Sequence, residues 1–236
     1  MGSKERQERD RLRVRQAILD AARDLFVTDG YRNVSMRKIA ERIEYSPAAI
    51  YSYFPSKDDI FFALAEEGFR ILADLGMASA DAASDPLERL RHGLRAFYQF
   101  SKVHPEYFEL MFVDRSVPGI SQDFQRFDVF QHVTARAEAD IRACIERGQF
   151  TAALNPAAAL HVLWVGMMGA ATIGLAGRLA PGEDPDALAH DILETLLAGF
   201  ATYGTTFVAS DCAFRTSQAS RDPHPVARAG RHADAP

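Results

Sequence analysis

The segment YSPAAIYSYFPSKDD, residues 45–59, concentrates side chains that can bind an anion. Tyr51 and Tyr53 carry phenol hydroxyls and Lys57 carries an ammonium group, and all three donate hydrogen bonds to negatively charged oxygens. Tyrosines packed this densely belong either in a hydrophobic core or on a binding surface. In a core they would only fill space, whereas on a surface they could hold phosphate oxygens. The helices that carry these side chains decide between the two.

Serine residues mark the starts of three helices around this segment. Ser35, Ser46 and Ser56 each precede an apolar-periodic stretch, where a serine hydroxyl can accept a hydrogen bond from a free helical N–H. Pro47 follows Ser46 at the first helical position, where its missing N–H costs nothing. A longer apolar stripe precedes them and stops before Gly30. The predicted helices are 10–29, 36–43, 47–54 and 57–79.

The spacing of two of these helices is that of a helix-turn-helix. Only residues 44–46 separate helix 36–43 from helix 47–54. Packed on the first helix, the pair would form a three-helix unit whose last helix enters the major groove of DNA. On that last helix Ile50 and Phe54 lie four residues apart and face the core. This periodicity points Tyr51 and Tyr53 away from the core, although a core position for them stays an alternative.

A longer pattern supports this interpretation. The run VSMRKIAERIEYSPAAIYSYFPSKDDIFFAL, preceded by RQAILDAARDLFVTDGY, resembles the DNA-binding domain of the TetR (tetracycline repressor) family. The shared features are a helix end A-x-x-L-F before G-Y, a short helix with I-A, a serine-started helix ending in Y-x-[YH]-F, and a following K-[DE]-[DE]. The match covers roughly residues 12–72. It implies an all-α fold in which residues 12–72 bind DNA through a helix-turn-helix at 35–54.

The resemblance also implies which residues meet DNA. Tyr51, Tyr53 and Lys57 would contact phosphates, and Arg37 is the candidate for binding guanine through its bidentate guanidinium. Three of the four residues expected to face the bases have no hydrogen-bonding side chain. We therefore expect specificity to rest on Arg37, Ser52, packing against thymine methyl groups and DNA shape. The predicted DNA-binding set is Ser35, Arg37, Ser46, Pro47, Ala48, Ala49, Tyr51, Ser52, Tyr53 and Lys57.

Charge separates the front of the chain from its body. Residues 1–60 contain 12 Lys and Arg against 10 Asp and Glu, whereas residues 61–209 contain 11 against 19. A mildly basic front on an acidic body permits a polyanionic partner at the front. We predict residues 1–11 to be a flexible charged arm, whose arginines either reach the DNA or stay solvated. Residues 210–236 are polar and lack a periodic apolar face, so we predict a disordered tail.

The remaining chain is also predicted to be helical. Asp85-Pro86, Asn155-Pro156 and the turn at 181–186 open further helices, and no stretch alternates with the period of a strand. Together these helices would form a larger C-terminal domain at 73–209, which binds a ligand and dimerises. The predicted helices are about 86–103, a continuation in YFELMF, 121–148, 157–177 and 186–208.

One of these helices requires a choice between membrane and protein interior. The segment 157–177 has no formal charge and is long enough to span a bilayer. We favour a helix buried in the protein and predict no membrane association, because the neighbouring amphipathic helix carries Asp191 and Glu194. A single helix-turn-helix contacts too few base pairs to be selective, so the chain must dimerise. We expect the homodimer to form through 157–177 and 186–208, as the four-helix bundle implied by the resemblance does.

Aromatic and methionine side chains are concentrated in residues 80–178. Most would form core, but by analogy with the family some would line a pocket for a small effector. Such walls suit an apolar or a cationic aromatic ligand. The resemblance implies that a ligand favouring another pitch of helix 57–79 changes the spacing of the two recognition helices and releases DNA. The predicted pocket set is Phe97, Phe100, His104, Phe108, Met111, Phe127, Trp164 and Met168.

Signals for other classes of protein are missing from the sequence. There is no G-x-S-x-G, no H-E-x-x-H, no glycine-rich phosphate loop and no cysteine cluster, so we predict no catalytic residue, no cofactor, no metal site and no enzyme. Two distant cysteines and a charged N-terminus without a signal peptide predict the cytoplasm. We expect a transcriptional repressor. The alternatives are an apolar-ligand-binding or membrane-associated helical protein, and a DNA-binding regulator without a small effector.

Overall fold

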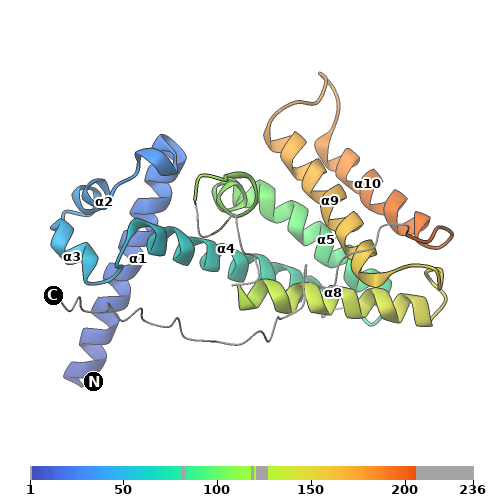
Figure 1. Cartoon of the computed structure of the whole chain (residues 1–236), viewed down its shortest axis with the longest axis horizontal. Coiled ribbons are helices and arrows are strands. Elements are labelled where there is room, and N and C mark those ends of the chain that lie inside the picture. Colours follow the sequence, from blue (N-terminus) through green and yellow to red (C-terminus); the bar gives the residue numbers. More distant parts are fainter. Residues whose placement is uncertain (1, 81–82, 118–119, 121–126, 206–236) are drawn as a thin grey trace, which may run out of the picture.

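The fold is all-α, as predicted. The structure is a computed structural model that describes residues 2–80, 83–117, 120 and 127–205, and these residues form helices without strands (Figure 1). The elements in chain order are α1 Ser3–Asp29, η1 Tyr31–Asn33, α2 Met36–Arg42, α3 Pro47–Tyr51, α4 Lys57–Ala80, α5 Pro86–Val103, α6 Pro105–Phe108, η2 Glu109–Val113, α8 Asp128–Glu146, α9 Pro156–Leu175 and α10 Pro185–Gly199.

The helices form a small unit at the front and a larger body. The elements α1, α2 and α3 gather at one end, and α4 leads from them to the other end, where α5, α8, α9 and α10 lie (Figure 1). Ile18, Ile39, Ile50 and Phe61 are fully buried in the front unit. A helix rises about 1.5 Å per residue, so the 24 residues of α4 span roughly 36 Å. This one helix therefore belongs to both parts.

Side-chain caps start the helices where the sequence predicted them. Ser35 accepts a hydrogen bond from the N–H of Lys38, and Ser46 accepts one from Ala49, both at 3.2 Å. Asn155 caps α9 in the same way through the N–H of Ala158 at 3.0 Å. Each cap satisfies an N–H that has no partner inside its helix. The other predicted starts are capped likewise, by Ser56, Asp85 and Asp184.

The beginning of α1 differs from the prediction. Residues 3–11, predicted as a flexible arm, continue the first helix, which begins at Ser3 rather than near residue 10. The stretch consists mainly of Lys, Arg, Glu and Gln, which favour helices, and it contains neither Gly nor Pro. The backbone N–H of Gly2 donates to the carboxylate of Glu5 at 3.0 Å and so caps the new start. The prediction failed because it relied on an apolar stripe, which this exposed part of the helix lacks.

The last helix is shorter than predicted. We expected it to reach residue 208, but α10 ends at Gly199. The N–H of Thr151 donates to the carbonyl of Phe200 at 2.9 Å, which ties the end of α10 to the turn before α9. A Cβ on Gly204 would lie 2.8 Å from the carbonyl oxygen of Ala153, so the chain passes close to that turn. The predicted tail 210–236 and the predicted helical residues 121–126 lie outside the described residues.

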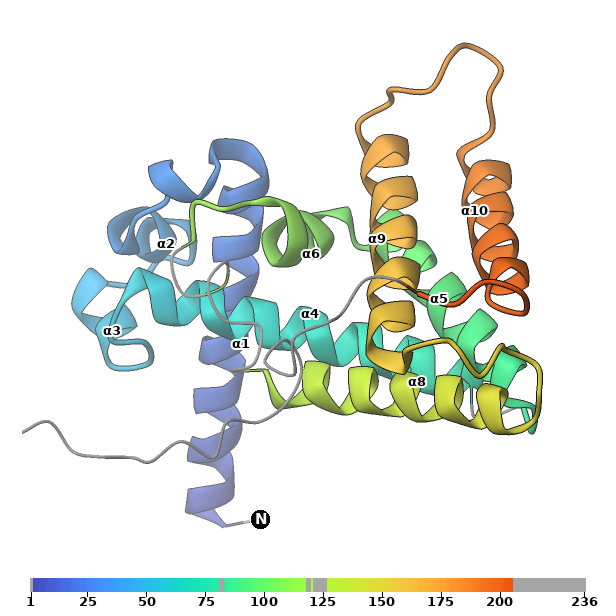
Figure 2. The same ribbon diagram turned by 45° about the vertical axis from the view of Figure 1, so that its right-hand side comes forward.

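The pair α9 and α10 is antiparallel and stands side by side at the end remote from α1 (Figure 2). Gly166 allows this approach, because a Cβ there would lie 2.7 Å from a methyl group of Leu196. By length and hydropathy α9 could cross a membrane, and 39% of its apolar window is buried within the described protein. Gly166 of α9 therefore allows close packing of α9 on α10 within the chain.

Ion pairs fasten α10 to α5. The guanidinium of Arg91 donates to both carboxylate oxygens of Glu194, at 2.8 and 3.0 Å. In the first turn of α10, Asp186 accepts hydrogen bonds from Lys102 at 2.7 Å and from the phenol of Tyr98 at 2.9 Å. The hydrogen bond from Lys102 lowers the pKa of Asp186 below its usual value. Asp186 and Glu194 of α10 are thus both paired with side chains of α5.

Candidate nucleic-acid interface

The helices α2 and α3 form a helix-turn-helix that is fixed against α1. Lys38 pairs with Asp29 at 2.7 Å, and Arg42 pairs with Asp24 at 3.4 Å, so two cations of α2 are held by carboxylates of α1. The hydrogen bond from Lys38 lowers the pKa of Asp29. The turn to α3 contains Glu44 with a φ of 59°, in the left-handed region that non-glycine residues seldom adopt. Lys38 and Arg42 therefore both connect α2 to α1 through exposed ion pairs.

The two faces of α3 differ as the sequence predicted. Ile50 is fully buried and Phe54 is 4% exposed, so both belong to the core. Tyr51 is 54% exposed, which excludes a core position for its ring. Tyr53 is half-buried and packs against the core with part of its ring. The helix ends at Tyr51 instead of residue 54. Helical geometry is disfavoured for a residue that precedes a proline, and Phe54 precedes Pro55.

The small residues at the start of α3 leave its surface nearly without hydrogen-bonding groups. Pro47 and Ala48 are exposed, and Ala49 is half-buried. The hydroxyl of Ser52 donates to the carbonyl of Ala49 at 2.7 Å. The hydroxyl of Ser46 accepts from the N–H of Ala49, as that of Ser35 does at the start of α2. A partner would meet methyl groups and hydroxyls already engaged with the backbone.

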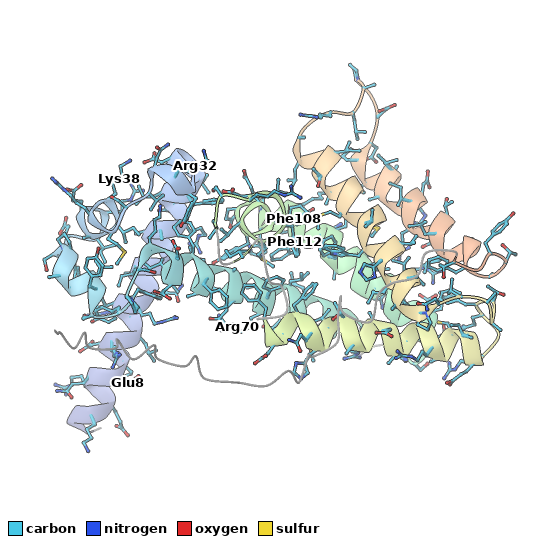
Figure 3. The ribbon with its side chains drawn as sticks, in the orientation of Figure 1. Glu8, Arg32, Lys38, Arg70, Phe108 and Phe112 are labelled. Carbon is cyan, nitrogen blue, oxygen red and sulfur yellow. The ribbon has the colours of Figure 1, made fainter. Side chains whose placement is uncertain are left out.

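Of the two arginines of α2, Arg37 is the more exposed. Its side chain is 81% exposed and forms an ion pair with Glu41, one turn later, at 2.7 Å. The hydrogen bond to Glu41 raises the pKa of Arg37. Exposed pairs of this kind contribute little to stability because solvent screens them, so an anionic partner could replace Glu41 at little cost. Figure 3 shows Arg32 and Lys38, two further cations, on the same front unit.

Lys57 differs from the other predicted DNA contacts in that its ammonium group already has partners within the protein. Its ammonium group donates to the carbonyl oxygens of Tyr31 at 3.0 Å and Val34 at 3.1 Å. It also lies 3.9 Å from the centre of the Tyr31 ring, within the range of a cation–π interaction. The phenol of Tyr31 donates to Asp58, and burial together with this hydrogen bond raises its pKa. Lys57 therefore joins the start of α4 to η1, a use that its sequence position did not reveal.

The extended α1 adds a side chain to this region that the sequence did not single out. A crevice of about 430 Å³ lies between the N-terminal turns of α1 and the end of α3, and its walls include Arg11, Ser52 and Tyr53. The guanidinium of Arg11 thus lies in the same crevice as Ser52 and Tyr53, two of the predicted DNA contacts. The prediction grouped Arg11 with the arginines of a flexible arm. The helix-favouring composition of residues 3–11, which contain no Gly or Pro, is the signal that could have placed Arg11 on a helix.

A cavity of about 620 Å³ lies in the body. Residues of α4, α5 and α8 form most of its wall, and η2 and α9 complete it. Of the predicted pocket residues Phe97 and Trp164 line this cavity. The other six do not line it, because four are packed in the core and two lie elsewhere, one of them between α5 and α6. Those six are Phe100, Phe108, Met111 and Phe127 in the core, and His104 and Met168, which are half-buried.

Most of the cavity wall was not predicted. Small residues such as Gly76, Ala73 and Gly93 create the space, and aromatic rings on several elements surround it. Its charged groups include Arg89 and Asp140, which form an ion pair across the wall. Within the described residues no group of three or more His, Cys, Asp or Glu side chains could hold a metal ion.

Two family models match the chain, and together they cover both parts of the fold. Residues 18–64 match bacterial regulatory proteins of the tetR family, and residues 90–196 match the tetracyclin repressor-like C-terminal domain. The chain belongs to the TetR family. The first match contains α2 and α3, and the second extends from α5 into α10. The family assignment made from the sequence is therefore confirmed.

Sequence similarity to individual TetR-family proteins covers a smaller part of the chain than the two family models do. It is 29% identical to the transcriptional activator FasR of Mycolicibacterium smegmatis over 98 residues, 42% of this chain and 45% of FasR. It is 33% identical to the transcriptional repressor KstR of the same species over 125 residues, 50% of this chain and 58% of KstR. The chain thus spans about half the length of these curated relatives.

The fold extends over more of the chain than these sequence matches. The regulator FadR from Bacillus subtilis, solved in complex with stearoyl-CoA, superposes with a TM-score of 0.66 at 18% identity. That superposition covers 78% of this chain and 98% of FadR. Similarity at this level of identity shows a common fold and leaves the ligand of this chain open.

Proposed function

We propose that this TetR-family chain is a DNA-binding transcriptional regulator that binds a palindromic operator as a homodimer and leaves it when a small effector binds. The observation that carries the proposal is the structure of α3. Ser46 caps it, Ile50 anchors it in the core, and Tyr51 is exposed at its last position. A short helix held in this way can enter a major groove while flanking phenols hold phosphates.

The proposed contacts divide into two kinds. Tyr51, Tyr53 and Arg11 would hold the phosphate backbone, and Arg37 would bind a guanine edge once it leaves Glu41. Lys57 would act chiefly by fixing α4 against η1. The remaining predicted residues of the interface would pack against thymine methyl groups or the backbone, namely Ser35, Ser46, Pro47, Ala48, Ala49 and Ser52.

Dimerisation through α9 and α10 is supported by exposed apolar groups on α9. Val165 is 61% exposed and Ile173 is 39% exposed, although both lie in the most apolar helix of the described chain. A Cβ on Gly169 would have no neighbour within 4 Å, so a second subunit could approach closely there. Burying this face against a second copy would bring two recognition helices onto successive turns of DNA.

Control by an effector is supported by the position of the cavity. The wall from Phe69 to Ala80 belongs to α4, the helix that begins beside the recognition helix at Lys57. A ligand that binds one position of α4 more tightly than another shifts the equilibrium between the two, by no more than that difference in affinity. The stearoyl-CoA complex of FadR supports a small-molecule ligand in this fold.

The similarity to the repressor KstR supports repression as the mode of regulation. The regulator would act in the cytoplasm and would have no catalytic activity. The activator FasR keeps activation as the second possibility. The sign of regulation follows from where the operator lies relative to its promoter.

Selection of binding sites from random duplex DNA tests this function. Purified chain should enrich a palindrome whose half-sites lie about one helical turn apart, because two-fold dimers bind in that way. Arg37→Ala should lose about 1–3 kcal/mol of discrimination at one base pair in each half-site. Arg42→Ala removes the same charge from the same helix and should leave the preferred sequence unchanged. Failure to enrich any palindrome at low salt would contradict the proposal.

A further inference from the structure

Helical periodicity identifies which face of α5 borders the cavity. The wall residues on this helix are Arg89, Leu90, Gly93, Leu94 and Phe97. Residues three or four apart lie on one face of a helix, so these residues form a single stripe with Gly93 in its middle. A side chain added at position 93 would therefore point into the cavity. A Cβ there would have no neighbour within 4 Å, which means that no protein atom fills the space beside it.

Gly76 has the same position on α4. It lies within the stripe of Phe69, Ala73, Met77 and Ala80, which lines the cavity along this helix. A Cβ at Gly76 would also have no neighbour within 4 Å. Both glycines therefore leave room in the cavity that a larger side chain would take away.

The cavity is long, and its two ends differ. Phe69 and Ala80 lie at the two ends of its α4 wall, eleven helical steps or roughly 16 Å apart. The end at Phe69 is aromatic, because the centroid of this ring lies 5.8 Å from that of Phe112 and 5.4 Å from that of Phe130. Towards the other end the α4 wall consists of smaller residues, including Gly76 and Ala80. A cavity of about 620 Å³ with this length suits an extended molecule better than a compact one.

The buried carboxylate of the wall is already paired. Asp140 is 7% exposed and accepts a hydrogen bond from the guanidinium of Arg89 at 2.9 Å. Arg89 also donates to the carbonyl oxygen of Ser84 at 3.0 Å. The other carboxylate of the wall, that of Asp74, belongs to an exposed residue. Since burying a charge without a partner is costly, the part of a ligand inside the cavity is expected to be uncharged.

The aromatic end does not form a cage for a cation. Phe112 meets Phe97 and Trp164 at interplanar angles of 65° and 68°, and it meets Phe69 at 87° (Phe112 is labelled in Figure 3). A cation binds over the face of an aromatic ring. Here the rings pack against one another instead, so they form an apolar wall. Of the two ligand classes that the sequence allowed, this arrangement favours the apolar one over the cationic aromatic one.

From these observations we infer that the effector is an uncharged aliphatic chain that lies along α4, and that Gly76 and Gly93 set the greatest chain length the cavity accepts. Each methylene that moves from water to an apolar wall raises the affinity by about fourfold. The affinity should therefore rise with chain length until the cavity is full. This inference rests on the proposed function, in which the cavity holds the effector.

Calorimetry of the full chain with hexan-1-ol, octan-1-ol and decan-1-ol tests the dependence on length. The affinity of the parent protein should rise by about fourfold for each added methylene. In Gly76→Leu the new side chain occupies part of the cavity, so decan-1-ol should bind about tenfold more weakly or worse. Hexan-1-ol should lose less than about threefold, because a short chain fits into the part that remains. Gly93→Leu, on α5, should show the same pattern.

Ala139→Leu is the matched control. Ala139 is exposed on α8 and lies outside the cavity wall, so the same side chain there should leave the affinity for each alcohol unchanged. Circular dichroism shows whether each variant is folded. Equal losses for hexan-1-ol and decan-1-ol in a folded glycine variant would overturn the inference. An affinity of the parent protein that does not rise with chain length would also overturn it, and this outcome depends on no variant.

The absence of charge is tested with 1,10-diaminodecane, which has the chain length of decan-1-ol and an ammonium group at each end. It should bind to the parent protein at least about tenfold more weakly than the alcohol, because a charge would enter the apolar cavity. Comparable affinity for the two molecules would contradict an uncharged ligand. Affinity of the parent protein for the selected duplex, measured without ligand, tests the regulatory function separately and can fail or succeed independently.

Discussion

Replacing Lys57 by methionine is expected to lower the free energy of unfolding by about 2–3 kcal/mol and to weaken operator binding at least tenfold. Methionine keeps the length of the side chain but cannot donate to the carbonyl oxygens of Tyr31 and Val34. The tie between α4 and η1 is then lost, and α2 begins only three residues after η1. Chemical denaturation and fluorescence anisotropy with the selected duplex measure the two effects.

The salt dependence of binding separates this role from a direct phosphate contact. Each phosphate contact contributes about −0.9 to the slope of log affinity against log salt concentration. A positioning role predicts an unchanged slope and a lower stability, whereas a phosphate contact predicts a shallower slope and an unchanged stability. Lys38→Met is the matched control, since its exposed pair with Asp29 is screened by solvent and should contribute little to stability.

Gly68→Ala is expected to destabilise the protein by about 1–3 kcal/mol and to weaken operator binding with it. Gly68 lies on α4 where α6 and η2 press against it. A Cβ there would lie 2.4 Å from the sulfur of Met111 and 3.0 Å from the ring of Tyr107. Tyr107 accepts a hydrogen bond from Arg23 of α1 at 2.8 Å, so moving its ring would disturb the front unit as well.

Gly76→Ala supplies the control for this substitution. Gly76 lies on the same helix, and a Cβ there would have no neighbour within 4 Å. Alanine in a helix is more favourable than glycine by about 0.5–1 kcal/mol, so this variant should be more stable than the parent protein. Thermal unfolding of both variants gives the comparison. A Gly68→Ala protein as stable as Gly76→Ala would show that α6 does not press on α4.

The features that could be predicted from sequence are local. A serine before an apolar-periodic stretch identifies a helix start whatever lies beyond it, so the caps at Ser35 and Ser46 were found. The spacing of Ile50 and Phe54 likewise determined which side of α3 faces the core and which carries Tyr51. Such signals depend on residues within one or two turns.

The features that could not be predicted depend on how helices meet. Phe100 and Phe108 resemble pocket residues in sequence, yet both are fully buried by neighbouring helices. The space of the cavity arises at Gly76 and Gly93, whose small size gives no signal of a binding site. The partners of Lys57 lie more than twenty residues away, on η1 and beyond. Only the packed structure brings these groups together.

The central claim is that two copies of the helix-turn-helix, held by a dimer, bind adjacent turns of one duplex. Anisotropy titration of the selected palindrome against a duplex with five base pairs inserted between its half-sites tests this claim most directly. The insertion turns one half-site to the opposite face of the DNA. We predict two chains per parent duplex and at least a hundredfold weaker binding to the altered one. Equal affinity for both duplexes, or one chain per palindrome, would contradict the account.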